Sequence, residues 1–163
     1  MNIDIDLELE SKDLIYAACI SAVNGIIERR KRRNFADDLD SIVSINLGRQ
    51  TGHTDATIKL YDHYTRKGYS VFIVSTTRGH AKTIRDRGRG ENVNISNVDC
   101  TSIRTFLNPI TWRGRSLDKT IFILDTTMRG FTDSVLQFLE VNRLSVGMGN
   151  VEDQPIFIGL GIN

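Results

Sequence analysis

A seven-residue segment that contains two glycines has the composition of a turn that binds phosphate. Residues 48–54 read Gly-Arg-Gln-Thr-Gly-His-Thr and follow a short apolar run at 42–46. Glycine permits a tight turn, so backbone N–H groups can point inward, and the start of a following helix adds partial positive charge. The alternative is a glycine-rich turn kept for packing. Phosphate binding is predicted for Gly48, Arg49, Gln50, Thr51, Gly52, His53 and Thr54.

The template G-x-x-x-x-G-K-[ST] assigns roles within this segment. Aligned on Gly52, the chain has Leu47 in place of the first glycine and His53 in place of the lysine. Thr54 supplies the hydroxyl that would bind Mg²⁺. The template lysine is a permanent charge, whereas a histidine with an ordinary pKa of about 6.5 is mostly neutral at about pH 7. Arg49 could replace part of the missing charge, because a guanidinium binds phosphate through two parallel hydrogen bonds.

Four segments, in order along the chain, resemble the ATPase core of viral DNA-packaging terminases and related helicase-like ATPases. Residues 48–54 are similar to their shortened phosphate loop, which often reads R-Q-x-G-K-[ST], and residues 71–77 to the strand and Ser/Thr-rich turn after the first helix. Residues 121–125 resemble the Walker B strand that ends in an Asp, and residues 156–161 resemble the next strand and its coupling turn. The resemblance covers residues 41–163.

The resemblance implies a P-loop NTPase fold with ATP and Mg²⁺ as cofactors. It also implies that Thr54 and Asp125 hold the Mg²⁺, and that Asp125 and Arg49 have catalytic roles, Arg49 by sensing the terminal phosphate. Thr126 stands where hydrolysing relatives place a Glu that orients the attacking water. Because phosphoryl transfer depends on positioning and charge neutralisation, the changes at His53 and Thr126 predict slow or absent hydrolysis.

Basic side chains gather in one stretch of the chain. Residues 78–115 carry eight basic and three acidic side chains, a net charge of +5, although the whole chain has a net charge of +1. Such a field attracts the phosphates of nucleotides or nucleic acids; a solvated arginine surface is the alternative. The segment 87–90 (Arg-Gly-Arg-Gly) is interpreted as a loop, and the only tryptophan could stack on a base or pack beside a turn. Nucleic-acid contacts are predicted for Arg87, Arg89, Trp112, Arg113 and Arg115.

Short apolar runs that alternate with helical patterns must position these residues. The pattern predicts strands at 42–46, 70–74, 93–98, 120–124 and 155–159, and helices at 54–67, 78–87 and 132–140. This alternation is typical of a mostly parallel sheet with helices on both faces, and ligands bind such sheets at the carboxyl ends of the strands. We therefore predict an α/β fold, a parallel, doubly covered sheet of P-loop NTPase type.

The first 40 residues predict an N-terminal strand–helix appendage, 1–40, before the core at 41–163. Residues 3–10 alternate apolar and acidic side chains, which suits a strand at a sheet edge. Ser11 could cap a helix over 12–33. The consecutive basic residues 29–33 suit a helix C-terminus better than a nucleic-acid tail. The apolar stripe of this helix would be Leu14, Ile15, Ala18, Cys19, Ala22, Ile26 and Ile27.

The composition excludes several classes of protein. With 163 residues, 40% apolar and 25% charged, the chain is neither collagen-like nor largely disordered. No apolar run approaches the roughly 18 residues of a membrane span, and the acidic N-terminus is unlike a secretion signal, so we expect no membrane contact and a cytoplasmic location, in the host cell if the protein is viral. Cys19 and Cys100 are expected to be reduced and packed, and the three histidines lack zinc-ligand spacing.

Two function hypotheses follow. The first is a divergent phage or viral ATPase-like domain that binds nucleotide and Mg²⁺ weakly and acts with nucleic acid. Compared with a complete terminase or translocase, the sequence lacks a nuclease domain and a second helicase lobe, so motor activity would need self-assembly or a protein partner. The second is a catalytically inactive module of the same fold that grips DNA or a host or viral protein through residues 78–115. The changes at His53 and Thr126 motivate the second.

Overall fold

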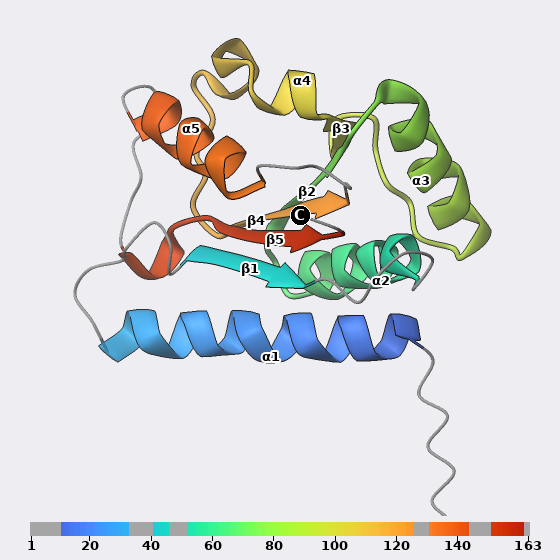
Figure 1. The fold of residues 1–163 in the computed structure, drawn as a ribbon, viewed down its shortest axis with the longest axis horizontal. Helices are drawn as coiled ribbons and strands as arrows, with labels where there is room; N and C mark the ends of the chain where they lie inside the picture. Colours follow the sequence, from blue (N-terminus) through green and yellow to red (C-terminus); the bar gives the residue numbers. More distant parts are fainter. Residues whose placement is uncertain (1–10, 33–40, 46–51, 126–130, 144–150, 162–163) are drawn as a thin grey trace, which may run out of the picture.

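The computed structural model describes residues 11–32, 41–45, 52–125, 131–143 and 151–161. These residues contain a sheet of five parallel strands in the order β1-β5-β4-β2-β3, with helices on both faces (Figure 1). The predicted α/β class and doubly covered parallel sheet are confirmed. The strands are β1 (Ile42–Ile45), β2 (Ser70–Ser75), β3 (Cys100–Ser102), β4 (Thr120–Asp125) and β5 (Ile156–Leu160). The helices are α1 (Ser11–Arg32), α2 (His53–Arg66), α3 (Arg78–Gly90), α4 (Ile103–Phe106) and α5 (Phe131–Arg143), with 3-10 turns η2 (Pro109–Trp112) and η3 (Val151–Asp153).

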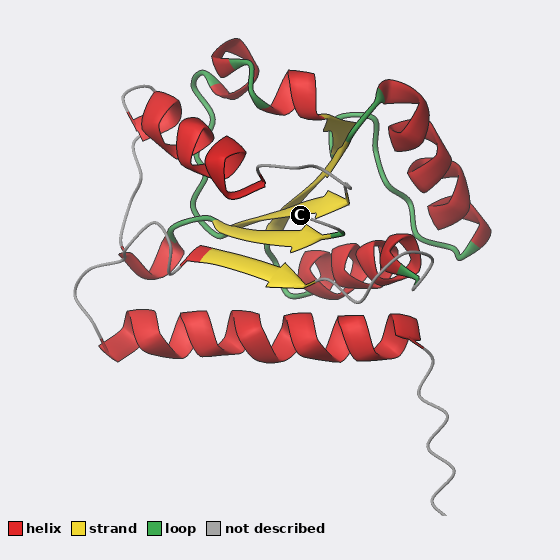
Figure 2. Cartoon of the chain, in the orientation of Figure 1, coloured by secondary structure: helices red, strands yellow, loops and turns green. Residues whose placement is uncertain are grey.

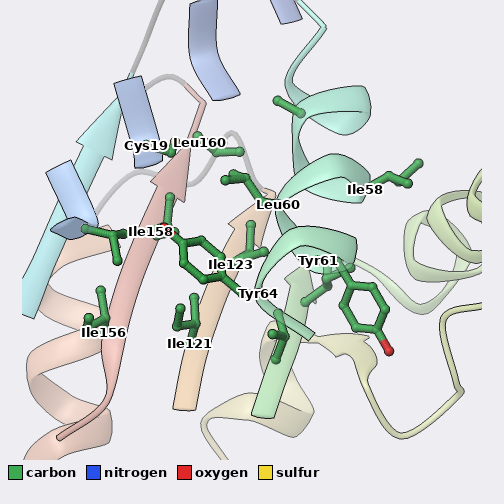
Figure 3. Packing of buried hydrophobic residues seen from close by; sticks show 14 of the residues in the cluster. Cys19, Ile58, Leu60, Tyr61, Tyr64, Ile121, Ile123, Ile156, Ile158 and Leu160 are labelled. Carbon is green, nitrogen blue, oxygen red and sulfur yellow. The ribbon is translucent and has the colours of Figure 1, made fainter. Parts of the chain in front are cut away.

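Side chains alternate along each strand, so each face of the sheet has its own core. One face is aliphatic, and α1, α2 and α3 pack on it (Figure 3). On this face Ile121, Ile123 and Ile158 of the sheet share one cluster with Leu60 and Tyr64 of α2, and each is at most 2% exposed. This packing fixes α2, and therefore its N-terminus, relative to the strands.

The opposite face is aromatic and is covered by α4, η2 and α5 (Figure 2). Phe122 of β4 and Phe157 of β5 stack with their ring centroids 5.1 Å apart, and Phe106 of α4 stacks on Phe138 of α5 at 4.4 Å. Trp112 of η2 meets Phe122 edge-on at 5.2 Å. Stacked and edge-to-face ring pairs add stability beyond the burial of their area. The segment between β3 and β4 is therefore held on this face by its aromatic side chains.

Helix α1 belongs to the aliphatic core. The side chains that it contributes to the buried cluster are Ile15, Cys19, Val23 and Ile26. The predicted stripe is wrong at Leu14, which is 46% exposed, and at Ala18, which is also exposed. The buried positions recur every three or four residues, which defines a stripe rotated slightly from the predicted one. The predicted strand at 3–10 and the boundary at residue 40 lie outside the described residues.

Arg30 gives the basic run at the end of α1 a structural role, in addition to the favourable placement of cations at a helix C-terminus. It is 4% exposed. Its guanidinium donates hydrogen bonds to the Ser41 hydroxyl at 2.7 Å, to the Pro155 carbonyl at 3.0 Å and to the Gln154 carbonyl. Hydrogen bonds from a charged donor contribute about 1.5–3 kcal/mol each. Arg30 therefore ties α1 to the segment that leads into β5.

The strand predicted at 93–98 is wrong, because the edge strand β3 begins later, at Cys100, and pairs with β2. The Ser96 hydroxyl accepts a hydrogen bond from the N–H of Asp99 at 3.1 Å, and the Ser96 carbonyl accepts one from the N–H of Cys100 at 3.2 Å. Serine side chains that bond to nearby backbone compete with sheet pairing in this way. The chain therefore turns at 96–99 before it joins the sheet.

The Arg-Gly-Arg-Gly segment is the last turn of α3, and its interpretation as a loop is wrong. Gly88 is buried, and a Cβ at this position would lie 3.0 Å from the Val93 carbonyl oxygen and 2.9 Å from Ile95 Cδ1. Glycine thus lets the chain at 93–95 approach the helix closely. The other helix and strand ends differ from their predicted positions by at most three residues.

Cys19 and Cys100 are both buried and free, as predicted. Burial raises the pKa of each thiol to about 12, so both stay protonated and unreactive near neutral pH. In the part of the chain that the structure describes, no helix has the length and apolar character needed to cross a membrane.

Candidate functional site

The sheet topology changes direction between β4 and β2, at the carboxyl ends of these two strands. The chain leaves β2 through α3 to reach β3 on one side, and it leaves β4 through α5 to reach β5 on the other. Helix α3 packs on the aliphatic face, whereas α5 packs on the aromatic face. Ligands of parallel sheets bind where neighbouring connections diverge in this way. The last residues of the two strands, Asp125 and Ser75, are register partners at this point.

Helix α2 brings Thr54 to the same place. Gly52 has a left-handed φ of 79° and is the N-cap of the helix, which begins at His53. The Thr54 hydroxyl donates a hydrogen bond to Asp125 Oδ2 at 3.0 Å, across 71 residues of sequence. Because the aliphatic core fixes α2 on the sheet, the first turn of the helix lies against the end of β4. The two residues that the resemblance implies as metal ligands are therefore in direct contact.

The turn after β2 adds His80 to this group. The Ser75 hydroxyl donates to the Thr77 carbonyl at 2.7 Å, and its oxygen also lies 3.2 Å from the Thr101 carbonyl oxygen of β3, so the turn is held against the sheet. Thr77 is the N-cap of α3, and its hydroxyl accepts the N–H of His80 at 3.0 Å. His80 Nε2 then lies 3.6 Å from Asp125 Oδ2. One carboxylate oxygen is thus shared by a hydroxyl and an imidazole.

The electrostatics of the site centre on the Asp125 carboxylate. Its side chain is 8% exposed, whereas that of His80 is 36% exposed. The carboxylate raises the pKa of His80 above its ordinary value, although partial burial of the imidazole opposes that effect. A second acid near the start of α2, Asp55, is paired with the Arg87 guanidinium at 2.8 Å. Arg87 thus pairs with Asp55, whereas Asp125 faces the Thr54 hydroxyl and the His80 imidazole.

The predicted phosphate loop is only partly within the described residues. Gly48, Arg49, Gln50 and Thr51 lie outside them, as does Thr126. His53 is the first residue of α2 and is partly exposed. The structure thus describes the helical end of the loop, from Gly52 onward.

The predicted nucleic-acid residues lie on α3 and on η2 with the segment that follows it. Arg87 and Arg89, on α3, form ion pairs with Asp55 at 2.8 Å and Asp86 at 3.3 Å respectively. Arg113 and Arg115 follow η2 and are exposed. Arginines that are close together in the sequence thus lie on separate elements or bind nearby acids.

The base-stacking role predicted for Trp112 is wrong. Its side chain is 1% exposed, and its indole N–H donates to the Phe106 carbonyl at 2.8 Å. The Arg115 guanidinium lies over the ring at 5.9 Å from its centroid. The ring is enclosed by the aromatic core, so no face is left for a nucleotide base.

Sequence reasoning missed His80 and Ser75. Zinc-ligand spacing considers residues close in sequence, whereas His80 reaches Asp125 through the end of β2 and the start of α3. The sequence does contain a pattern that could have identified His80. Ser75 ends a strand and Thr77 caps the following helix, which places the third residue of that helix, His80, at the carboxyl edge of the sheet. The order of the strands was needed to see which acid lies opposite.

Among the described residues, no group of three or more His, Cys, Asp or Glu side chains could hold a metal ion by itself. A cation at Asp125 would therefore need hydroxyl, water or phosphate oxygens to complete its coordination. In the comparisons with known proteins, no protein-family model matches the sequence, and no curated protein is significantly similar to it.

Proposed function

We propose that this chain is a divergent ATPase-like domain of the P-loop type, which binds ATP and Mg²⁺ weakly and acts with nucleic acid. The observation that carries the proposal is the 3.0 Å contact between the Thr54 hydroxyl and Asp125 Oδ2. It joins the end of a phosphate-loop sequence to a strand-end acid at the point where parallel sheets bind ligands. Strand β5 lies between β1 and β4 in the sheet. Helix α2, which follows β1, therefore passes β5 on the aliphatic face before Thr54 can contact Asp125 of β4.

The donor set suits Mg²⁺ bound to phosphate. Mg²⁺ prefers oxygen ligands and is usually held by one or two protein side chains together with phosphate and water. Thr54 and Asp125 supply one hydroxyl and one carboxylate, both at the N-terminal end of α2, where the helix dipole favours anions. When bound, Mg²⁺ would neutralise phosphate charge. The role of the chain is to hold the metal at Thr54 and Asp125 and to orient the phosphates toward the helix.

Weak binding and slow hydrolysis follow from two sequence changes. His53 replaces the lysine that would bridge the phosphates, and Thr126 replaces the Glu that would orient water. A lysine is a permanent cation with a longer reach than an imidazole. Binding energy is therefore expected to come from the metal and from backbone N–H groups.

A nucleotide titration with and without Mg²⁺ tests this function. We expect Mg²⁺-dependent ATP binding in the wild type and its loss, by tenfold or more, in Thr54→Ala. Thr57→Val is a matched control on the same helix, because Thr57 is fully buried and its hydroxyl has no hydrogen-bond partner among the described residues. His53→Lys should tighten binding. Equal affinity in wild type and Thr54→Ala, or no binding at millimolar ATP, contradicts the proposal.

A second candidate function is a DNA-gripping module without nucleotide, and one cavity favours it. A cavity of about 210 Å³ lies at the end of β3, lined by Arg78 and Arg85 and by the polar side chains Asn97, Thr101, Ser102 and Thr105. Its lining includes no acid. Arg85 is held in place by donating to the Cys100 carbonyl at 3.0 Å. Salt-sensitive DNA binding that is lost in Arg78→Gln and unaffected by Thr54→Ala, without any ATP binding, would select this function.

A further inference from the structure

Two side chains from different elements, Thr54 and His80, approach a single oxygen atom, Asp125 Oδ2. Thr54 Oγ1 of α2 lies 3.0 Å from it, and His80 Nε2 of α3 lies 3.6 Å from it. Two ligands that are each about 2.1 Å from one metal ion lie roughly 3 to 3.5 Å from each other. The 3.0 Å separation at Thr54 lies in the range for neighbouring ligands of one cation, and the 3.6 Å separation at His80 lies just above it.

The backbone that carries each of the three side chains is held by its own contacts. Asp125 ends the central strand β4 and is 8% exposed. Thr54 is on a helix fixed by the aliphatic core. His80 is fixed because Thr77 caps its N–H at 3.0 Å and Ser75 ties Thr77 to the end of β2. The geometry is thus prepared by the fold before any ligand arrives.

The imidazole changes which metal the site should prefer. Mg²⁺ takes oxygen ligands almost exclusively, whereas first-row transition metals accept imidazole nitrogen together with oxygen. We propose that His80 is a nitrogen ligand to the metal at Asp125 and Thr54, so that the site prefers a first-row transition metal such as Mn²⁺ over Mg²⁺. This inference rests on the proposed function, since it names the metal class of the same site. Phosphate and water oxygens would complete the coordination.

Imidazole ligation predicts a signal that a simple ion pair between His80 and Asp125 does not. If His80 only balances the charge of Asp125, a bound metal has oxygen ligands alone. If His80 is a ligand, its ¹⁴N nucleus couples magnetically to the unpaired electrons of Mn²⁺. Pulsed EPR (electron spin echo envelope modulation) of the full chain with Mn²⁺ and inorganic tripolyphosphate detects this coupling. The probe contains no nitrogen, so any ¹⁴N coupling comes from the protein.

We expect ¹⁴N modulation in the wild type and its loss in His80→Ala. The preference for Mn²⁺ over Mg²⁺, measured by competition, should fall about tenfold in the same variant. His63→Gln is the histidine control, because His63 lies on α2 beside Tyr16 of α1, away from the sheet end. His53→Ala tests the one other histidine at the start of α2, and the modulation should persist in it.

Modulation that is absent from the Mn²⁺-bound wild type, or that persists in His80→Ala, overturns the inference. Failure to bind Mn²⁺ also overturns it. The proposed function is judged separately by Thr54-dependent binding of Mg²⁺ and ATP, which uses a different metal and a different readout. If that binding is present without nitrogen modulation, only the role of His80 falls.

Discussion

Two regions of this chain were predicted to be functional, and they differ in how their residues are arranged in the fold. At the carboxyl edge of the sheet, Thr54 and Asp125 are 71 residues apart in sequence and touch at 3.0 Å. In the basic region, residues 78–115, the five predicted nucleic-acid residues are close in sequence but lie on α3 and on η2 with the segment after it. Arg87 forms an ion pair with Asp55, Arg89 forms one with Asp86, and Trp112 is buried in the core.

The difference has a physical cause. In a parallel sheet all carboxyl ends lie at one edge, so residues at strand ends and the following helix starts converge whatever their separation in sequence. The positions of arginine side chains are not fixed by the sheet in this way, because each long side chain forms an ion pair or hydrogen bond with a nearby acid or carbonyl. Position relative to a strand end therefore anticipated a tertiary contact here, that of Thr54 with Asp125.

The largest effect is expected at Trp112, and it is an effect on folding. Trp112→Ala should lower the free energy of unfolding by about 3–5 kcal/mol, because it empties a fully buried site and leaves the Phe106 carbonyl without its donor. Chemical denaturation measures this loss. Trp112→Phe should recover much of it. If the Trp112→Ala protein is as stable as the wild type but binds nucleic acid less tightly, Trp112 contacts nucleic acid and this account of its role is wrong.

The next largest effect is a difference in stability between substitutions at the two glycines of the Arg-Gly-Arg-Gly segment. Gly88→Ala should cost about 1–3 kcal/mol of unfolding free energy, since its Cβ would crowd the Val93 carbonyl oxygen at 3.0 Å. Gly90→Ala is the matched control, because a Cβ there meets nothing within 4 Å. Thermal denaturation of both variants compares them directly. Equal stabilities would show that the segment behaves as a loop, as the sequence first suggested.

A smaller effect on stability is expected for substitutions of the arginines in the basic region. Arg87→Gln should lower the free energy of unfolding by at most about 1 kcal/mol, the usual worth of a partly exposed ion pair, here with Asp55. Arg113→Gln, at an exposed position, should change it by less. If both substitutions weaken DNA binding equally while stability stays constant, the basic region acts as one surface after all.

The smallest effect is a pKa change at His80. Asp125 raises the pKa of His80, so the pair stabilises the fold fully at pH below about 6.5 and loses that contribution as the pH rises through the raised pKa. In Asp125→Asn the pKa of His80 should fall toward its ordinary value. Two-dimensional NMR of the histidine ring measures both pKa values. An unchanged His80 pKa in this variant would contradict the described contact.

The sequence predicted the fold class well because strands such as Thr120–Asp125 and Ile156–Leu160 are short apolar runs bounded by turns. It also singled out Thr54 at a helix start and Asp125 at a strand end, and the structure brings these two residues into contact. It could not predict strand order, and His80 was missed for that reason. The loop interpretation at Gly88 was wrong and the buried role of Arg30 was not predicted, because both depend on Ile95 and Pro155, which only tertiary packing brings near.

A double-mutant cycle on Mg²⁺-dependent nucleotide binding tests the central claim, that Thr54 and Asp125 form one site. Affinities of the wild type, Thr54→Ala, Asp125→Asn and the double variant are measured by calorimetry. We predict a coupling free energy of at least about 1 kcal/mol, because removing either residue disables the metal position that the other serves. Effects that add within about 0.3 kcal/mol, or a wild type that binds no nucleotide with Mg²⁺, would contradict it.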